Sequence, residues 1–529
     1  MLNVSHTYWH LYQQAQGWSR RLEPFVRSSA VWKPGLRLLD DSGQPRVYDS
    51  AAQLNASIEI LRAASADLAR TIPRIGALPA LHQMLADNYY SFSDSAGGDH
   101  PLPLPVIKIA AAQVFAHGPW TQAEARGARD RLQLLLAYSW LEYQLIAMRQ
   151  IRAIRRGVAV LTDTGLEPDD ELEEVATGQR HAFSVGGRIQ RFANGTTERM
   201  FVRPHEFLAA AFGVLAGDPP SDVAVFSGTH LAQFPDAVDG HAFWVGLTAR
   251  LQLLVLARDR ADQAGSSHLA IFEEAAVAFD PDEPALRGVT RSDFHALQQA
   301  VMRCFWRPGT SVAADEESTM FVDRPVMRIA REPGLFVTST LNIADSLTSV
   351  AERAVSPRVS DVSLPPKYFE QLLSGPFEER IIAMFRDHGF LAGEVTRSGA
   401  WKTQAGIRTS RVAGKPDGQI DVLAWHPGGM LIVGDCKVLA LAHTPEAATT
   451  QWAKLGEDDE EQFRAKLHKR EKWSQAFLAD LGHDVSTTMK MLILDRPLHL
   501  WLDGGDIDLV YEGDLMAALA EAEGIAAAT

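Results

Sequence analysis

One stretch decides how this chain folds: Gly418-Gln-Ile-Asp-Val-Leu-Ala-Trp425, His426-Pro-Gly-Gly429 and Met430-Leu-Ile-Val-Gly-Asp-Cys-Lys437. Two apolar segments flank a turn rich in Pro and Gly, a pattern typical of a β-hairpin. Asp421, Asp435 and Lys437 interrupt these segments, where a buried strand ordinarily carries no charge. We therefore interpret the three residues as a site. The alternatives are an ordinary hairpin with two unpaired acids, or a surface pair of Asp435 with Lys437.

The spacing also predicts which residues oppose one another. If 427–429 form the turn, His426 pairs with Met430, and the same register places Asp421 opposite Asp435. Directly opposed residues have Cβ atoms about 4.5–5.5 Å apart. Two carboxylates at that separation repel each other unless a cation lies between them, and hard oxygen ligands suit Mg²⁺. The pattern thus predicts a metal site.

An Asp on one strand, followed by Asp-x-Lys on the next, resembles the PD-(D/E)xK nuclease superfamily, the restriction-endonuclease-like fold. Residues 418–424 are similar to the first metal-binding strand of that family, and 433–437 to its (D/E)xK strand. The literal Pro-Asp pair at 416–417 also matches the name of the motif. Asp421 fits better, because it lies inside the apolar strand and opposes Asp435.

The resemblance implies a role for each residue of the site. Asp421 and Asp435 would bind Mg²⁺, with Mn²⁺ as a possible substitute, and the main-chain carbonyl of Cys436 would be a third ligand. Lys437 would position the attacking water and stabilise the transition state. Many family members carry a further carboxylate on the first helix, where Glu378 is the candidate; a partly exposed helix acid is its alternative interpretation. The Cys436 side chain points to the opposite face and is expected in the core.

The resemblance covers residues 365–529, where the sequence predicts an α/β domain with an αβββαβ core. A helix is expected to begin near Pro376 and to end at Gly389. Residues 393–411 are expected to form a first strand with a basic excursion. After the hairpin, an amphipathic helix over 457–481 precedes a short buried strand over 489–494.

At 529 residues the chain is too long for a single core. We expect a mostly α N-terminal region over 1–115, a mixed α/β regulatory or sensing region over 116–355, and the nuclease-like domain over 365–529. The mixed region includes β-hairpin insertions, with turns predicted at Asn194-Gly195 and at 332–334. The fold class is therefore multidomain. Residues 1–355 show no P-loop, dinucleotide-binding, HExxH or GxSxG motif. We expect this region to sense, regulate or recruit, through a protein partner or a trigger, and the oligomeric state stays open.

Composition is that of an ordinary globular protein, with 46% hydrophobic and 22% charged residues. The two cysteines, Cys304 and Cys436, suggest no disulfide framework. The N-terminus lacks a signal-peptide pattern, and no run of 18 uncharged apolar residues is present. We therefore expect a cytoplasmic location and no membrane interaction.

The net charge of −15 counts against a general nucleic-acid binder, so any attraction for a polyanion must be local. Two basic groups flank the proposed site, and each could equally be a solvated face. The predicted phosphate contacts are Arg397, Arg408 and Arg411 on the strand side, and Lys466, Lys469 and Arg470 on the helix side. Gln462 and Lys466, four residues apart, resemble the Q-x-x-x-(Y/K) element of some family branches.

The expected function is that of a metal-dependent nuclease. DNA is preferred over RNA because most of the family cuts DNA, and the long N-terminal region resembles the layout of bacterial defence or restriction nucleases. The rival hypothesis is a non-catalytic nucleic-acid-binding or scaffold protein that retains the fold. Net acidity favours this rival slightly, whereas the intact Asp/Asp/Lys set argues against it.

Overall fold

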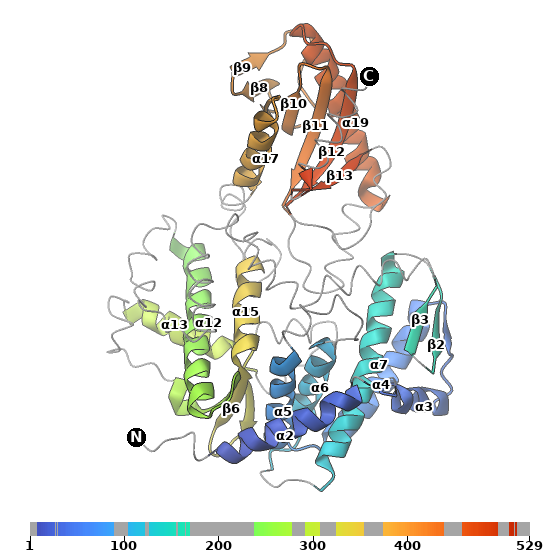
Figure 1. The fold of residues 1–529 in the computed structure, drawn as a ribbon, viewed down its shortest axis with the longest axis vertical. Coiled ribbons are helices and arrows are strands. Elements are labelled where there is room, and N and C mark those ends of the chain that lie inside the picture. The colour runs from blue at the N-terminus through green and yellow to red at the C-terminus, as the bar shows by residue number, and fades with distance from the viewer. Residues whose placement is uncertain are drawn as a thin grey trace. The chain divides into compact units, whose positions relative to one another are not determined.

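The chain forms two compact units, residues 1–364 with 442–449, and residues 365–441 with 450–529 (Figure 1). The computed structural model describes residues 8–26, 28, 30–88, 104–121, 126–154, 157–163, 165–169, 237–277, 291–306, 324–353, 374–438, 457–495, 507–512 and 514–515. The predicted hairpin at Asn194-Gly195 lies outside these residues.

Helices dominate the described part of the first unit. They are α2 (Trp9–Val26), α3 (Lys33–Asp41), α4 (Ala51–Ala69), α5 (Arg74–Asn88), α6 (Leu104–His117), α7 (Ala128–Ile154), α12 (Ala237–Gln263), α13 (Arg291–Arg303) and α15 (Thr340–Arg353). A short 3₁₀ helix covers Glu274–Val277. Two three-stranded sheets accompany them: β1 (Val47–Tyr48), β2 (Ala159–Thr162) and β3 (Gly165–Pro168) in that order, and β4 (Leu269–Glu273), β6 (Leu335–Ser339) and β5 (Met327–Ala330) in that order.

The first unit has a core that crosses the boundary expected at 115/116. Leu81 on α5, Leu135 on α7 and Ile271 on β4 belong to one buried hydrophobic cluster. The described residues on the two sides of that boundary therefore share a core. The hairpin predicted around Glu332-Pro-Gly334 is confirmed, because β5 and β6 pair antiparallel on either side of this turn.

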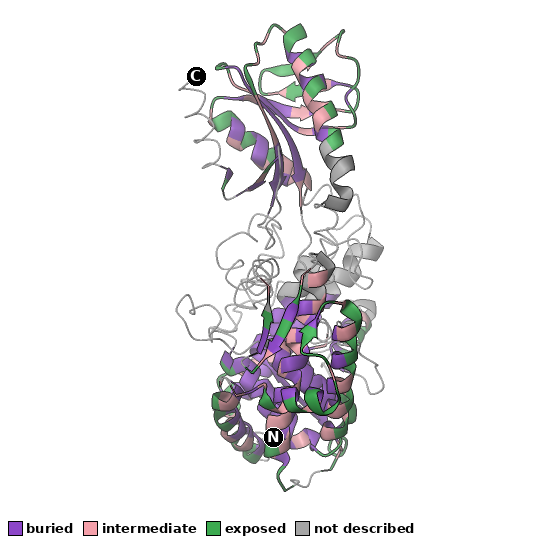
Figure 2. Cartoon of the chain, turned by 90° about the vertical axis from the view of Figure 1, so that its right-hand side faces the viewer, coloured by how far each residue is buried: buried purple, intermediate pink, exposed green. Residues whose placement is uncertain are grey.

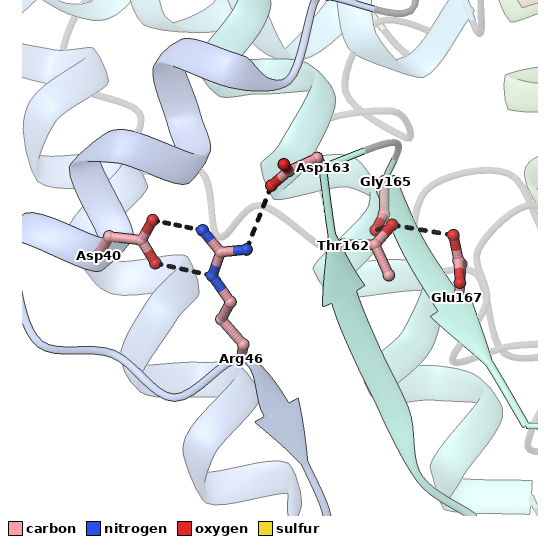
Figure 3. A network of polar contacts seen from close by, with 6 residues as sticks. All are labelled: Asp40, Arg46, Thr162, Asp163, Gly165 and Glu167. Carbon is pink, nitrogen blue, oxygen red and sulfur yellow. Dashed lines mark hydrogen bonds and ion pairs between the residues drawn. The ribbon is translucent and has the colours of Figure 1, made fainter.

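Polar contacts at the surface connect α3 with the β1–β2–β3 sheet (Figure 3). The Arg46 guanidinium donates to both carboxylate oxygens of Asp40, at 3.0 and 2.7 Å, and to Asp163 at 3.2 Å. Thr162 Oγ1 lies 2.9 Å from Glu167 Oε1 on the neighbouring strand. Such exposed pairs orient the sheet edge but contribute little to stability.

The second unit contains a mixed seven-stranded sheet in the order β13-β12-β11-β10-β7-β8-β9. Its elements are α17 (Gly375–Asp387), β7 (Leu391–Val395), β8 (Ala400–Thr403), β9 (Gly406–Thr409), β10 (Ile420–Trp425), β11 (Met430–Lys437), α19 (Glu457–Asp480), β12 (Thr487–Leu494) and β13 (Asp508–Tyr511). Strands β7, β10 and β11 pair antiparallel, whereas β12 pairs parallel with both β11 and β13. Along the chain, α17, β7, β10, β11, α19 and β12 follow the order expected from the sequence. The β8–β9 hairpin is inserted in the chain between β7 and β10, and in the sheet it lies at the edge beside β7.

The predicted register of the central hairpin is confirmed. Val422 pairs with Gly434, and Trp425 pairs with Leu431. At the turn, the His426 main-chain N–H donates to the Met430 carbonyl at 2.9 Å. Gly429, which ends this turn, has φ of +87°, a backbone conformation that glycine adopts without steric cost.

The sheet of the second unit has a buried layer on each face (Figure 2). On β11, Ile432 and Cys436 belong to the cluster that includes Phe385 of α17. Leu431 and Val433 belong to the other cluster, which includes residues of α19. Because side chains alternate along a strand, Asp435 and Lys437 lie on the α19 face.

Candidate active site

Asp435 and Lys437 meet on one face of β11, as predicted. The Lys437 ammonium group lies 2.7 Å from Asp435 Oδ2. Asp435 is 4% exposed, so its charge is largely removed from solvent, whereas Lys437 is half-buried. Cys436 points to the other face and is buried in the core beneath α17, in agreement with its predicted orientation. The alternative was that Asp435 and Lys437 form an ion pair at an exposed surface. The burial of Asp435 does not agree with that alternative.

Asp421 joins this pair from β10. The pairing of β10 with β7 is irregular between Ile420 and Leu423, so the strand departs from a regular ladder at this acid. The side chains of Asp421 and Asp435 form a hydrogen bond with each other. Two carboxylates can share such a bond only when one carries a proton. Asp421 Oδ2 also accepts the main-chain N–H of Cys436 at 2.9 Å.

The surroundings separate the pKa values of the two acids. Burial, followed by the charge of Asp435, raises the pKa of Asp421 to about 8, and the charge of Glu378 acts in the same direction. Burial also disfavours the ionised form of Asp435, but Lys437, the hydrogen bond with Asp421 and Arg470 together hold its pKa below the ordinary value. For Lys437, burial opposes the charge, yet Asp435 raises its pKa overall. At neutral pH the site thus holds a protonated Asp421, an anionic Asp435 and a cationic Lys437.

Arg470 of α19 also belongs to the site, where it contacts Asp435. The sequence had predicted this residue as a phosphate contact instead. Its Nη1 lies 3.2 Å from Asp435 Oδ1, and its Nε donates to the Asp417 main-chain carbonyl at 3.0 Å. Only 13% of the side chain is exposed. The prediction of Arg470 as a phosphate contact therefore has to be amended, because the guanidinium faces a carboxylate. The available signal was its spacing, since buried Leu467 and Ser474 place Arg470 on the inward stripe of the helix.

Glu378 lies in the first turn of α17 and is half-buried, whereas its neighbour Glu379 is exposed. This contrast agrees with the sequence analysis, which preferred Glu378. Helix α17 covers the face of the sheet opposite to Asp435, so Glu378 is not on the same face as the acid–lysine pair. Its charge nevertheless raises the pKa of Asp421. Glu378 thus lies near enough to the site for its charge to favour the protonated form of Asp421.

The literal Pro-Asp pair at 416–417 does not supply the acid that meets Asp435. Asp417 is exposed and lies 3.7 Å from the Lys469 ammonium group. Its contribution to the site is the main-chain carbonyl that receives Arg470. The preference for Asp421 therefore agrees with the observed geometry.

The remaining basic residues differ in their surroundings. Arg408 Nη1 lies 2.9 Å from the His483 ring, which occupies part of its donor capacity. Lys469 is 69% exposed beside Asp417. Three of the predicted phosphate contacts are exposed: Arg397, Arg411 and Lys466. Gln462 belongs to α19, but its side chain lies outside the described residues.

The donors of this site fit a small, hard cation. Asp421 and Asp435 converge closely enough that the charge of Asp435 raises the pKa of Asp421, so a cation between them would offset their repulsion. On a strand, the N–H and C=O groups of one residue point to the same side, so the Cys436 carbonyl faces Asp421 together with its N–H. No three His, Cys, Asp or Glu side chains are grouped as metal ligands among the described residues. Two carboxylates and a main-chain carbonyl are oxygen donors that suit Mg²⁺, which binds through one or two carboxylates and retains several waters.

Comparison with known proteins supplies no relative: no protein-family model, no curated protein and no solved structure matches this chain. Within the described ranges, none of the helices combines the length and the apolar character needed to cross a lipid bilayer. What can be inferred about function therefore rests on the site itself.

Proposed function

We propose that residues 365–529 are a nuclease domain of the restriction-endonuclease-like fold, which hydrolyses phosphodiester bonds of DNA with Mg²⁺. The observation that carries this proposal is the convergence of Asp421 and Asp435 from adjacent strands, with Lys437 at 2.7 Å from Asp435. The order of helices and strands around the site supports it.

Asp421, Asp435 and the Cys436 carbonyl would hold the cation. When bound, Mg²⁺ lowers the pKa of a coordinated water and offsets negative charge on the phosphate. Lys437 stays cationic at neutral pH, because Asp435 raises its pKa. Its ammonium group can therefore donate to the attacking water and stabilise charge that develops on the phosphate. Asp421 has to lose its proton before it can bind a cation.

The test uses the full-length chain with supercoiled plasmid, linear duplex, single-stranded DNA and RNA, in Mg²⁺, Mn²⁺ or EDTA. We expect DNA cleavage that EDTA abolishes and that the isosteric variant Asp421→Asn lacks. The matched control, Asp417→Asn, removes an exposed acid only four residues away and should cleave normally. Mn²⁺ binding, measured directly, should be lost in Asp421→Asn and kept in Asp417→Asn. Equal cleavage by Asp421→Asn and the unmodified chain would overturn the proposal.

One observation favours a second candidate, a non-catalytic nucleic-acid-binding or scaffold domain. Lys437 contacts one oxygen of Asp435 and Arg470 contacts the other, so the carboxylate is already neutralised without any metal. A domain that never binds a cation would keep this arrangement. The same assays discriminate between the two functions, because this candidate binds DNA equally in Mg²⁺ and EDTA, binds no Mn²⁺ and cleaves nothing.

For the first unit we propose a sensing or regulatory role, as in a bacterial defence or restriction nuclease that acts in the cytoplasm. The support is architectural: a separate compact unit with its own core precedes the proposed nuclease. Deletion of residues 1–364 should change the rate or the trigger of DNA cleavage but leave Mn²⁺ binding intact. Unchanged cleavage by the isolated unit, with every substrate, would contradict this role.

A further inference from the structure

Arg470 is held at two points that lie on either side of the site. Its Nε donates to the main-chain carbonyl of Asp417, in the turn that precedes β10. Its Nη1 contacts Asp435 on β11. A Cβ added at Gly418 would come within 3.3 Å of Nη2, so the guanidinium also fits closely beneath that turn. The planar guanidinium matches this geometry, because its donors have fixed directions.

This arrangement competes with cation binding by Asp435. Lys437 contacts Oδ2 of the carboxylate, and Arg470 contacts Oδ1. A carboxylate offers about four lone-pair positions on its two oxygens, and these two donors, together with the interaction with Asp421, leave few of them for a metal ion. A cation close to the guanidinium would also meet its positive charge in a poorly solvated place.

We propose that Arg470 is a latch on Asp435, which neutralises the acid in the metal-free protein and is displaced when a divalent cation binds. This inference rests on the proposed function, since it concerns the same site. The Asp417 carbonyl remains a partner for the Nε atom, so only the Asp435 contact has to open. Arg470 is thus a positioning residue that sets the affinity of the site for its metal.

Lys469 provides a matched control, because it is the adjacent residue on α19 and carries the same charge. It is 69% exposed and its ammonium group lies 3.7 Å from the Asp417 carboxylate, on the solvent side of the helix. A purely long-range effect of positive charge would be similar for the two residues. A latch predicts an effect for Arg470 alone.

The experiment measures Mn²⁺ binding to the full-length chain from the electron paramagnetic resonance signal of the free ion. Arg470→Gln should tighten Mn²⁺ binding about tenfold, because a partly buried charge-assisted hydrogen bond no longer competes. Arg470→Lys keeps the charge but cannot reach both partners, and should tighten binding by a smaller factor. Lys469→Gln should stay within about twofold of the unmodified chain.

Melting temperatures provide a second readout that also reports whether each variant folds. In EDTA, Arg470→Gln should melt below the unmodified chain, and saturating Mn²⁺ should close the gap. An unchanged or weaker Mn²⁺ affinity of Arg470→Gln, in a chain that otherwise binds Mn²⁺ and cleaves DNA, would overturn the latch and leave the proposed function intact. An unmodified chain that neither binds Mn²⁺ nor cleaves DNA would overturn both.

Discussion

The main-chain N–H of Cys436 donates a hydrogen bond to Asp421 Oδ2 at 2.9 Å, where a side chain replaces the usual main-chain acceptor of the neighbouring strand. This bond fixes the direction of one carboxylate oxygen of Asp421. Asp421 is therefore oriented by the backbone of the Asp-x-Lys strand itself. Asparagine at position 421 retains an acceptor oxygen, which makes it the appropriate substitution for the tests below.

Removal of the Lys437 ammonium group should separate catalysis from metal binding. We expect Lys437→Ala to lose about 10²–10³-fold in turnover, the usual effect of deleting one transition-state donor, and to bind Mn²⁺ as well as the unmodified chain. Single-turnover cleavage and Mn²⁺ titration check the two parts. Lys437→Arg should not restore turnover, because a planar fork replaces a compact charge. Full activity of the arginine variant would show that only general positive charge is needed.

The metal-free protein should lose stability as pH rises, through Asp421. Its folded-state pKa of about 8 lies above the unfolded value of 3.8, so the folded state binds the extra proton between these limits. The contribution of Asp421 to the free energy of unfolding is fully present below pH 4, decreases as pH rises, and is lost above pH 8. Asp421→Asn cannot ionise. The melting temperature of this variant in EDTA, minus that of the unmodified chain, should therefore increase from pH 4.5 to pH 8. A difference that is the same at all pH values would contradict this assignment.

Metal binding should release a proton. Because Asp421 is protonated below about pH 8, the apparent affinity for Mg²⁺ should rise with pH and become constant above that value. Calorimetric titrations at pH 7, in two buffers with different ionisation enthalpies, should show release of about one proton for each cation. The same titrations at pH 9 provide the control, where release should approach zero. Binding that is independent of pH would mean that Asp421 is not a ligand.

Exposed basic side chains beside the site should contribute to DNA affinity through phosphate contacts. Replacement of Arg397, Arg411 and Lys466 by Gln, in an Asp421→Asn background, should weaken binding to all duplex sequences alike. It should also flatten the dependence of log K on log salt by about 0.9 for each lost contact. Fluorescence anisotropy over a range of KCl concentrations measures the slope.

The control for this measurement lies in the first unit. Arg149 donates to Asn55 Oδ1 at 2.9 Å, and Arg152 donates to the Tyr48 carbonyl at 3.3 Å. Both guanidinium groups therefore form hydrogen bonds within the first unit. Their replacement by Gln should leave the salt slope unchanged. A flatter slope for this pair, with no effect of the other three, would place the nucleic acid on the first unit.

Gly393 tests the fold of the second unit. A Cβ at this position would lie 1.7 Å from the Lys402 carbonyl oxygen, on the paired strand β8. Main-chain atoms of a sheet cannot move that far, so Gly393→Ala should destabilise this unit by about 3 kcal/mol or more. Gly17→Ala, on helix α2 with nothing within 4 Å of the added Cβ, is the control and should be neutral or slightly stabilising. Urea denaturation of both variants measures the difference.

The parts of the site that could be predicted are those that depend on neighbouring residues. The turn at 427–429 and the two-residue period of strands were sufficient for the register that brings Asp421 to Asp435. The alternation of side chains along a strand was likewise sufficient to place the Cys436 side chain in the core, on the face opposite to Asp435. Both inferences concern short stretches in which local geometry limits the choices.

The parts that could not be predicted depend on how distant elements pack. The spacing from Leu467 and Ser474 indicates that Arg470 lies on the inward stripe of α19, but not that this stripe packs over Asp435, which depends on how the helix sits on the sheet. Residues 393–411 were interpreted as one strand with an excursion, and they form β8 and β9 as well as part of β7. That hairpin is anchored by the buried Trp401, whose indole N–H donates to the Leu423 carbonyl at 3.1 Å.

The parallel pairing of β11 with β12 has a consequence for the order in which the site is completed during synthesis. The β10–β11 hairpin pairs residues that are close in sequence, so the segment that carries both acids is synthesised before α19 and β12. Arg470 follows later, and the pairing of β12 with β11 is complete only at Leu494. A nascent chain that stops earlier holds closely spaced acids without the helix cation that neutralises Asp435. The cation that neutralises Asp435 is thus added only after the hairpin that carries both acids, when the sheet around them is nearly complete.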